Sequence, residues 1–373
     1  MTQTTPSELD MLPALRGLPN IDLNRHVMLA LRAGRSASAI LLEAARLMRG
    51  PGKLSGSEYF YYRLWNEDIG PEQKREFVGR KAQNLMHVAC NDRHWYQTAA
   101  DKILFQTIMT GAGLPVPETL AVTQPLRWLP QAEALSEPER LANWLRDQAI
   151  YPLFAKQAGG KYSLNVLSLE LFDPNTDRLT LLGGGTISVE QVVGHMLGGN
   201  GYILQKRMAP HLGLANQFGP RLWSVRALVL VRQDGPIIHR ALVKIATGVN
   251  PADNYWRAGN MLGALDTEIG RITRVVSGAG ADLTICQSHP DTNAALVGAT
   301  VPNWPELRDL VCKAARVLPG IRTQSWDIAL TDRGPVLLEV NYGGDLNLTQ
   351  LAEGRGALDA AYRDHLSSCG YRL

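Results

Sequence analysis

The stretch that decides the fold is Ser325–Asp345, SWDIALTDRGPVLLEVNYGGD. Two largely apolar runs flank a Thr-Asp-Arg-Gly segment, a pattern that predicts two antiparallel strands joined by a tight turn. A three-residue loop, Asp332–Gly334, would use the glycine for the left-handed backbone position that such loops require. In that register Thr331 pairs with Pro335, and the pairing of every other residue in the hairpin follows.

That register places two carboxylates and an amide on one face of the hairpin. Asp327 lies directly opposite Glu339, and Asn341 follows Glu339 by two positions, so the three side chains share a face. Opposed carboxylates repel each other unless a cation lies between them, and oxygen ligands of this kind suit Mg²⁺. We therefore predict a metal site at these three residues. The alternative is an amphipathic hairpin whose acids only face solvent, with Leu338 and Val340 toward the core.

Outside the hairpin, the sequence predicts a helical N-terminal region, residues 1–98, followed by a β-rich body. Periodicity, Gly and Pro breaks and first-turn prolines indicate helices over 24–49, 57–67, 71–92, 101–110, 304–317 and 356–367. Alternating and β-branched runs indicate strands over 150–156, 163–170, 178–182, 201–208, 222–232 and 236–245. The fold class is therefore predicted as α+β, with mostly antiparallel sheets.

Composition narrows the functional classes. The chain has 373 residues, 45% hydrophobic and 20% charged, with a net charge of +3 and no massed basic run, which argues against nucleic-acid binding. No apolar stretch reaches the length of a membrane span, so we expect no membrane partner. The cysteines are far apart in sequence, without a CxxC pair or a His at metal-ligand spacing, which predicts reduced thiols, no zinc and a cytoplasmic location. They are Cys90, Cys286, Cys312 and Cys369.

These motifs resemble those of a known family. WDIALTDRGPVLLEVN is similar to the C-terminal metal motif of ATP-grasp enzymes, and the wider chain resembles the sugar-transfer-associated branch of that superfamily. AADKILFQTIMTGAGLPVPET resembles the segment that carries the first nucleotide-contacting lysine, here Lys102. LFAKQAGGKYSLNV resembles the strand and glycine loop that close on the phosphates, which implies roles for Lys156, Gly159 and Gly160.

Further motifs follow in the family's order. YILQKRMAPH resembles the hinge between two grasping lobes, and WSVRALVL and ALVKIATGVNPADNYWRAGN resemble the strands behind the phosphates. Lys244 stands where the family usually has arginine, and Ser224 replaces a threonine. The resemblance implies adenine contacts from the hinge, a ribose contact, and phosphate or acyl-phosphate contacts from the strands. The residues are Gln205, Lys206, Arg207 and Met208 for adenine, His211 for ribose, and Arg226 and Lys244 for phosphate.

The resemblance implies an ATP-grasp fold, with an N-terminal lobe at 99–200 and a C-terminal lobe at 201–373. It also implies an enzyme that uses ATP and Mg²⁺ to activate a carboxylate as an acyl phosphate. The enzyme would join this group to an amine or similar nucleophile of an amino acid, a peptide or a sugar-linked acceptor, so its partners would be small-molecule or peptide substrates. A phosphotransferase acting on a hydroxyl and a nucleotide-binding protein without turnover remain alternatives. Gln350 and Arg355 are candidate substrate contacts, and a homodimer is the default expectation for assembly.

Overall fold

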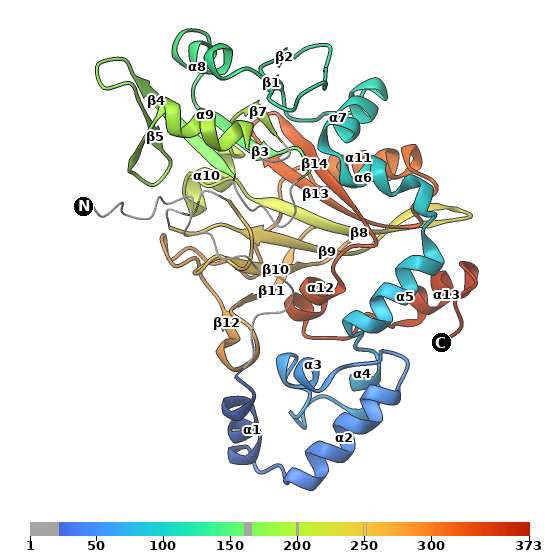
Figure 1. Ribbon diagram of the computed structural model, residues 1–373. Helices are drawn as coiled ribbons and strands as arrows, with labels where there is room; N and C mark the ends of the chain where they lie inside the picture. Colours follow the sequence, from blue (N-terminus) through green and yellow to red (C-terminus); the bar gives the residue numbers. More distant parts are fainter. Residues whose placement is uncertain (1–21, 160–165, 199–200, 249, 251) are drawn as a thin grey trace.

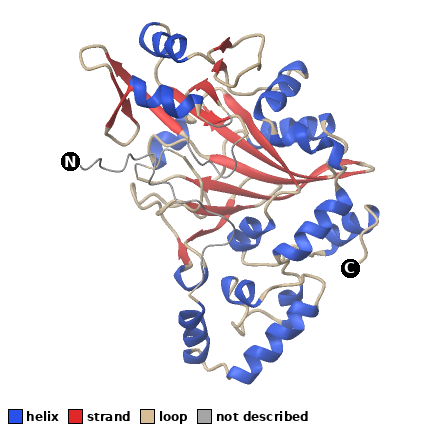
Figure 2. Cartoon of the chain, viewed as in Figure 1, coloured by secondary structure: helices blue, strands red, loops and turns tan. Residues whose placement is uncertain are grey.

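The computed structural model describes residues 22–159, 166–198, 201–248, 250 and 252–373. The predicted phosphate-loop residue Gly160 lies outside these ranges. Within them the chain forms two seven-stranded sheets with helices packed on them, and a group of short helices at the N-terminal side (Figures 1 and 2). The α+β class predicted from the sequence agrees with this arrangement.

The N-terminal helical region is more broken than the pattern predicted. The helix predicted over 24–49 is two helices, because Gly34 adopts a left-handed conformation (φ +89°) and Ser36 caps the second helix through a hydrogen bond from the amide of Ala39. The helix predicted over 71–92 is also divided, at Gly79. The helices of this region are α1 (Leu23–Arg32), α2 (Ala37–Arg49), α3 (Gly56–Tyr61), α4 (Pro71–Arg75), α5 (Arg80–Cys90) and α6 (Tyr96–Ala100), with a 3₁₀ turn η1 (Arg93–Trp95).

The first sheet has the strand order β2-β1-β7-β3-β4-β5-β6, and all its pairs are antiparallel except β1 with β2. β7 lies beyond residue 200 but pairs with β1 and β3, so the first sheet ends at Lys206 rather than at the predicted lobe boundary. Its strands are β1 (Thr119–Val122), β2 (Glu133–Ala134), β3 (Leu153–Gln157), β4 (Leu167–Asp173), β5 (Arg178–Leu181), β6 (Thr186–Ser188) and β7 (Tyr202–Lys206).

Helices α8 (Pro138–Asp147) and α9 (Val189–Leu197) cover one face of this sheet (Figure 1). Their apolar side chains, such as Leu141 and Met196, share a buried cluster with Leu153 and Ala155 of β3. Because side chains alternate along a strand, Phe154 and Lys156 point to the opposite face of the sheet. The first sheet therefore presents its uncovered face to the second sheet.

The second sheet has the order β12-β11-β10-β9-β8-β13-β14 and is antiparallel throughout. The sequence pattern predicted β8, β9, β13 and β14 but not the three strands between residues 261 and 286. Its strands are β8 (Ser224–Arg232), β9 (Gly235–Ile245), β10 (Met261–Leu265), β11 (Ile272–Ser277), β12 (Thr284–Cys286), β13 (Thr323–Thr331) and β14 (Gly334–Tyr342).

Both faces of the second sheet are covered. One face packs on α11 and α7 through a cluster that includes Trp326 and Ile328, and the other packs on the N-terminal helices, α5, α12 and α13. The remaining helices are α7 (Lys102–Gly111), α10 (Leu212–Phe218), α11 (Trp304–Val317), α12 (Leu346–Glu353) and α13 (Ala360–Ser368), with a 3₁₀ turn η2 (Gly280–Asp282). No helix of the described part of the chain is long and apolar enough to cross a membrane.

The β13–β14 hairpin differs from the prediction near its turn. Thr331 pairs with Gly334 rather than with Pro335, so the loop has two residues instead of three. A β-bulge between the pairs Asp327–Glu339 and Ile328–Leu337 inserts one extra residue, Leu338, into β14. The shorter loop and the bulge compensate for each other, and Asp327 lies opposite Glu339 as predicted.

Candidate active site

The acids of the hairpin line a cavity because the strand alternation buries the residues around them. Trp326 and Val340 point into the core and are at most 1% exposed, whereas Asp327 and Glu339 face the space between the sheets. The bulge turns Leu338 to the same side as Glu339, where it also lines the cavity, which corrects the prediction that Leu338 faces the core. The hairpin face that carries Asp327 and Glu339 is thus partly apolar.

Asp327 is held by two cations from neighbouring strands. Arg226 of β8 donates two hydrogen bonds of 2.7 Å to the two carboxylate oxygens, and Lys244 of β9 lies 3.1 Å from Oδ2. Lys244 also lies 3.5 Å from a carboxylate oxygen of Asp253, which Ser224 contacts. Although burial opposes ionisation, Arg226 and Lys244 hold the pKa of Asp327 well below its usual range. The carboxylate therefore stays charged at physiological pH.

A second cationic group faces the hairpin from the first sheet. Lys156 of β3 and Lys102, the first residue of α7, both line the cavity. Burial and the neighbouring charge of Lys102 lower the pKa of Lys156 to about 8. Two lysines placed this closely favour an anion between them, because an anion would relieve their repulsion and the cost of desolvating them. The arrangement suits a phosphate-bearing ligand.

Two cavities adjoin the hairpin, and the larger of these two lies between the sheets and has a volume of about 730 Å³. Lys102, Lys156, Lys244, Asp327 and Glu339 line one part of it. Its remaining walls combine apolar side chains with the hinge predicted from the sequence. These lining residues include Pro152, Phe154, Val166, Leu182, Leu222 and Leu338, together with Gln205, Lys206, Arg207 and Met208.

A smaller cavity of about 300 Å³ adjoins the first on the side of the N-terminal helices. The two cavities have Lys102, Lys244, Asp327 and Glu339 in common. Asn341 lines only the smaller one, so the three predicted metal ligands border this space together. Other lining side chains are mostly polar or aromatic: Glu58, Tyr62, Arg80, Gln83, His87, Asn254, Tyr255, Trp256, Asp345 and Asn347.

Several predicted contacts lie elsewhere. His211 caps α10, accepting a hydrogen bond from the amide of Gly213, and it is not among the described residues that line the larger cavity. Gly159 is exposed in the turn after β3. Gln350 is fully buried and bonds to the backbone of Val78, while Arg355 pairs with Glu353 outside both cavities. Gln350 and Arg355 therefore have structural or surface environments rather than the predicted substrate contacts.

Sequence reasoning also missed residues that the fold brings to the site. Phe154 could have been found, because it lies two positions before Lys156 on the same strand and must share its face. Arg80, Gln83 and His87 are spaced along one side of α5, but only the packing of that helix on the second sheet places them beside the hairpin. No local pattern distinguishes them from ordinary surface residues.

The residues of the hairpin fit a divalent cation. Glu339 makes no ion pair with another described residue, and Asn341 offers an amide oxygen on the same face, so oxygen donors suited to Mg²⁺ border the smaller cavity. Both oxygens of Asp327 already accept hydrogen bonds from Arg226 or Lys244. A cation at this position would therefore share Asp327 with the two basic side chains and take Glu339 as its least encumbered ligand.

Comparisons with known proteins give one family match and several solved structures of low identity. Residues 192–363 match the family model described as sugar-transfer associated ATP-grasp. No curated protein sequence matches the chain. Among solved structures, the ATP-grasp ligase PsnB complexed with a minimal precursor is similar at 16% identity and a TM-score of 0.40, over 76% of this chain and 63% of that chain.

Two further solved structures show a comparable likeness. The L-amino acid ligase from Bacillus licheniformis is 14% identical with a TM-score of 0.36, over 69% of this chain and 43% of that chain. The D-alanine-D-alanine ligase from Coxiella burnetii is 12% identical with a TM-score of 0.37, over 77% of this chain and 58% of that chain. The protein thus spans 63% or less of the length of each of these structures.

Residues 192–363, which include most of the second sheet and part of the cavity lining, match a family model of the ATP-grasp superfamily. Over these residues the chain resembles, within that superfamily, the sugar-transfer-associated family, as the motifs predicted. The predicted fold class, α+β with a helical N-terminal region, is confirmed.

Proposed function

We propose that the protein is an ATP-dependent ligase that activates a carboxylate as an acyl phosphate and transfers the acyl group to an amine. The observation that supports this proposal is the wall shared by the two cavities. Lys102, Lys244, Asp327 and Glu339 border both a nucleotide-sized space and a smaller polar space. Two substrates bound in these spaces would meet at the charged wall, which is the arrangement that phosphoryl transfer between them requires.

The larger cavity suits ATP. The polyphosphate of ATP carries about four negative charges near neutral pH, and these charges need cationic donors such as Lys102 and Lys156. Phe154 and Leu338 offer apolar surface for the base, and the hinge at Lys206–Met208 lines the same space. The amides of Lys206 and Arg207 already donate to backbone carbonyl oxygens, so hydrogen bonds to the base would come from the other backbone groups of the hinge. The apolar walls and the paired lysines thus match the two halves of a nucleotide.

Mg²⁺ bound at Glu339, Asn341 and Asp327 would neutralise charge on the transferred phosphoryl group. Arg226 and Lys244 hold Asp327 in place and add two positive charges behind it. Because these groups are fixed by strand pairing, little reorganisation is needed as charge develops during transfer. The role of the chain is therefore mainly to position the reactants and to stabilise charge.

The smaller cavity suits a polar acceptor about the size of an amino acid. Arg80 offers a donor for a carboxylate, and Asp345 offers an acceptor for an ammonium group. His87 stays neutral because burial lowers its pKa to about 4, and its Nε2 atom has no hydrogen-bond partner among the described residues. It can therefore exchange a hydrogen bond with a ligand without a change of charge.

The reaction balances without a protein nucleophile. An oxygen of the substrate carboxylate attacks the γ-phosphorus of ATP, and ADP leaves with the electrons of the broken P–O bond. The amine nitrogen then attacks the carbonyl carbon of the acyl phosphate, inorganic phosphate leaves, and the amine proton passes to solvent. The acyl oxygen that attacked the phosphorus remains in the released phosphate.

Transfer of that oxygen provides the test. Purified protein is incubated with Mg-ATP and a panel of amino acids, peptides and sugar acids whose carboxylates carry ¹⁸O, with a panel of amines as partners. Released phosphate is then analysed by mass spectrometry. The ligase proposal predicts ¹⁸O in the phosphate and phosphate release that depends on both substrates.

The control variants come from the same hairpin. Glu339→Ala should reduce turnover by about 10²-fold or more, because it removes the least encumbered metal ligand. Asp332→Ala removes an exposed carboxylate from the turn at the other end of the hairpin and should leave turnover unchanged. ADP formation with a phosphorylated hydroxyl product and no free phosphate would instead identify a phosphotransferase.

A further inference from the structure

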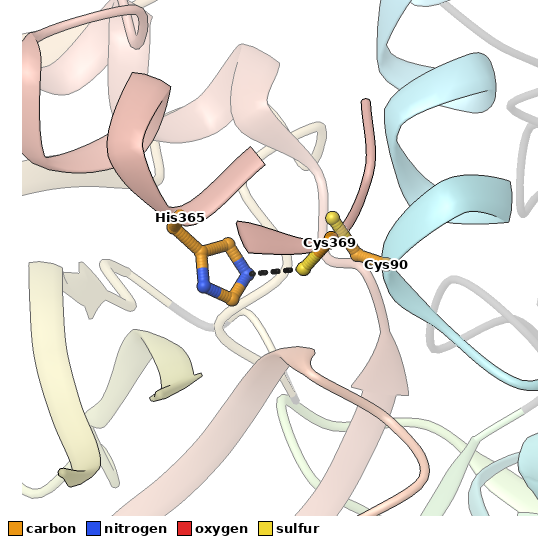
Figure 3. Close-up of side chains that lie close together, drawn as sticks. All are labelled: Cys90, His365 and Cys369. Carbon is orange, nitrogen blue, oxygen red and sulfur yellow. Dashed lines mark hydrogen bonds between the residues drawn. The ribbon is translucent and has the colours of Figure 1, made fainter. Parts of the chain in front are cut away.

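Outside the cavities, the fold brings together two thiols and an imidazole that are distant in sequence. Cys90 ends α5, His365 lies in α13, and Cys369 follows α13 as its C-cap; Figure 3 shows the three side chains converging. Their sulfur and nitrogen ligand atoms all lie within 4.8 Å of one another. The expectation that no histidine has metal-ligand spacing from a cysteine is therefore wrong, because His365 and Cys369 are one helical turn apart.

The two thiols have unequal environments. Cys90 is 3% exposed, whereas Cys369 is half-buried. A hydrogen bond between the two sulfurs lowers the pKa of Cys369 and raises that of Cys90, and burial raises the pKa of Cys90 further. Cys369 is therefore the more acidic thiol of the pair.

Basic neighbours support a thiolate at Cys369. Its sulfur lies 3.7 Å from Nε2 of His365, which also lies 3.0 Å from the hydroxyl of Thr323. Arg322 is fixed beside the pair by hydrogen bonds of 3.0 Å to the carbonyl and hydroxyl oxygens of Ser368, and its charge favours the thiolate. An accessible thiolate in a positive environment with a second thiol in reach is the setting in which cysteines react with oxidants.

We propose that Cys369 and Cys90 form a peroxide-reactive thiol pair, in which Cys369 is oxidised first and Cys90 closes a disulfide. The thiolate of Cys369 attacks one oxygen of a hydroperoxide and displaces the other as hydroxide or alkoxide, giving a sulfenic acid. The Cys90 sulfur then attacks the Cys369 sulfur, and water leaves with the Cys90 proton. Two thiols lose two electrons in total, and the hydroperoxide is reduced to water or an alcohol and water.

A bound thiophilic metal ion is the competing occupant of the cluster. A closed structural zinc site takes four protein ligands, whereas the described residues supply three metal-ligating side chains here. Nε2 of His365 already forms a hydrogen bond with the hydroxyl of Thr323. The positive guanidinium of Arg322 also disfavours a metal cation beside the sulfurs. These contacts favour thiol chemistry over metal binding.

The test measures oxidation of the full chain directly. Protein with reduced thiols is exposed to one equivalent of hydrogen peroxide, blocked with an alkylating reagent and digested without reductant. Mass spectrometry should then find a Cys90–Cys369 disulfide that dithiothreitol reverses. At pH 6 the alkylation of Cys369 should be roughly tenfold faster than that of Cys286 or Cys312, because only thiolates react and the pKa values of those two thiols are raised by burial.

Variants separate the two steps. Cys90→Ser should leave a sulfenic acid at Cys369 that a dimedone probe traps, whereas Cys369→Ser should abolish peroxide consumption by the pair. Cys286→Ser and Cys312→Ser are the matched controls and should behave as the unmodified protein. Equal reactivity of all cysteines, or a stoichiometric zinc ion released by thiol modification of the protein as isolated, would overturn the proposal. None of these readouts depends on ligase activity.

Discussion

At the residue scale, Lys156, the proposed phosphate contact, lies in an environment that opposes its positive charge. Burial and Lys102 lower its pKa to about 8, so without a ligand the side chain loses its proton as the pH rises through that value. The charged form is present below the pKa, and bound phosphates would stabilise it. If ATP occupies the larger cavity, its affinity should therefore fall at alkaline pH.

We predict that the Kd for Mg-ATP is nearly constant from pH 6.5 to 7.5 and rises above pH 8, approaching about tenfold per pH unit. Isothermal titration calorimetry across this range measures the effect. Lys156→Arg keeps a positive charge at every pH tested and should flatten the profile. A profile equally steep in the variant would assign the pH dependence to another group.

The charged residues of the site show which groupings can be predicted from the sequence and which cannot. Asp327, Glu339 and Asn341 could be grouped from the sequence because a strand has a fixed period of two and a hairpin has one register. The clamp of Arg226 and Lys244 on Asp327 could not be derived that way, because it depends on which strands become neighbours in the sheet. The cluster of Cys90 with Cys369 escaped prediction for the same reason.

At the element scale, the bulge in β14 explains how a wrong loop length still placed Asp327 opposite Glu339. Leu338 is the extra residue, and Leu337 and Val340 on either side remain in the core. Without Leu338, the pairing register found between the turn and Ile328 would extend to Asp327. Glu339 would then still lie opposite Asp327 and on the cavity face. The bulge therefore serves the cavity wall rather than the pairing.

Deletion of Leu338 should accordingly leave a folded protein that binds ATP more weakly, by roughly tenfold if one apolar contact with the base is lost. Leu337→Ala is the matched comparison, since it empties a fully buried position and should cost about 2–5 kcal/mol of unfolding free energy. Thermal unfolding and ATP titration of the two variants check both expectations. Greater destabilisation by the deletion would show that pairing needs the bulge.

Arg240 of β9 fixes α12 and α13 to the second sheet. Its guanidinium is fully buried and bonds to Glu353 at 2.7 Å, to Asp359 at 3.0 Å and to the carbonyl oxygen of Gly356 at 2.7 Å. Loss of this cation would leave two acids around an emptied, buried position.

Arg240→Ala should therefore lower the free energy of unfolding by about 3–5 kcal/mol. Chemical denaturation measures the change. Arg232→Ala, which removes an arginine from an exposed ion pair on the adjacent strand, should change it by less than about 1 kcal/mol. Equal effects would mean that the buried network contributes no more than a surface pair.

At the scale of the whole molecule, the larger cavity draws its walls from both sheets. Phe154 and Lys156 belong to the first sheet, and Lys244 and Glu339 belong to the second. Local patterns predicted most strands and the final hairpin, but the pairing of β7 with β1 and β3 involves contacts up to 86 residues apart, such as Thr119 with Gln205. Such placement requires the complete fold.

A ligand that bridges the sheets should couple their unfolding. A non-hydrolysable ATP analogue with Mg²⁺ that binds only the native state stabilises that state by about 2.7 kcal/mol when it is present at 100 times its Kd. Differential scanning calorimetry should show that the ligand raises the unfolding temperature of both sheets together and narrows any separation between two transitions. If the ligand contacted one sheet only, one transition would rise and the other would stay in place. Glu339→Ala and Lys156→Ala, which remove one charged group from each side, should each reduce the shift, and only a site built from both sheets responds to both variants.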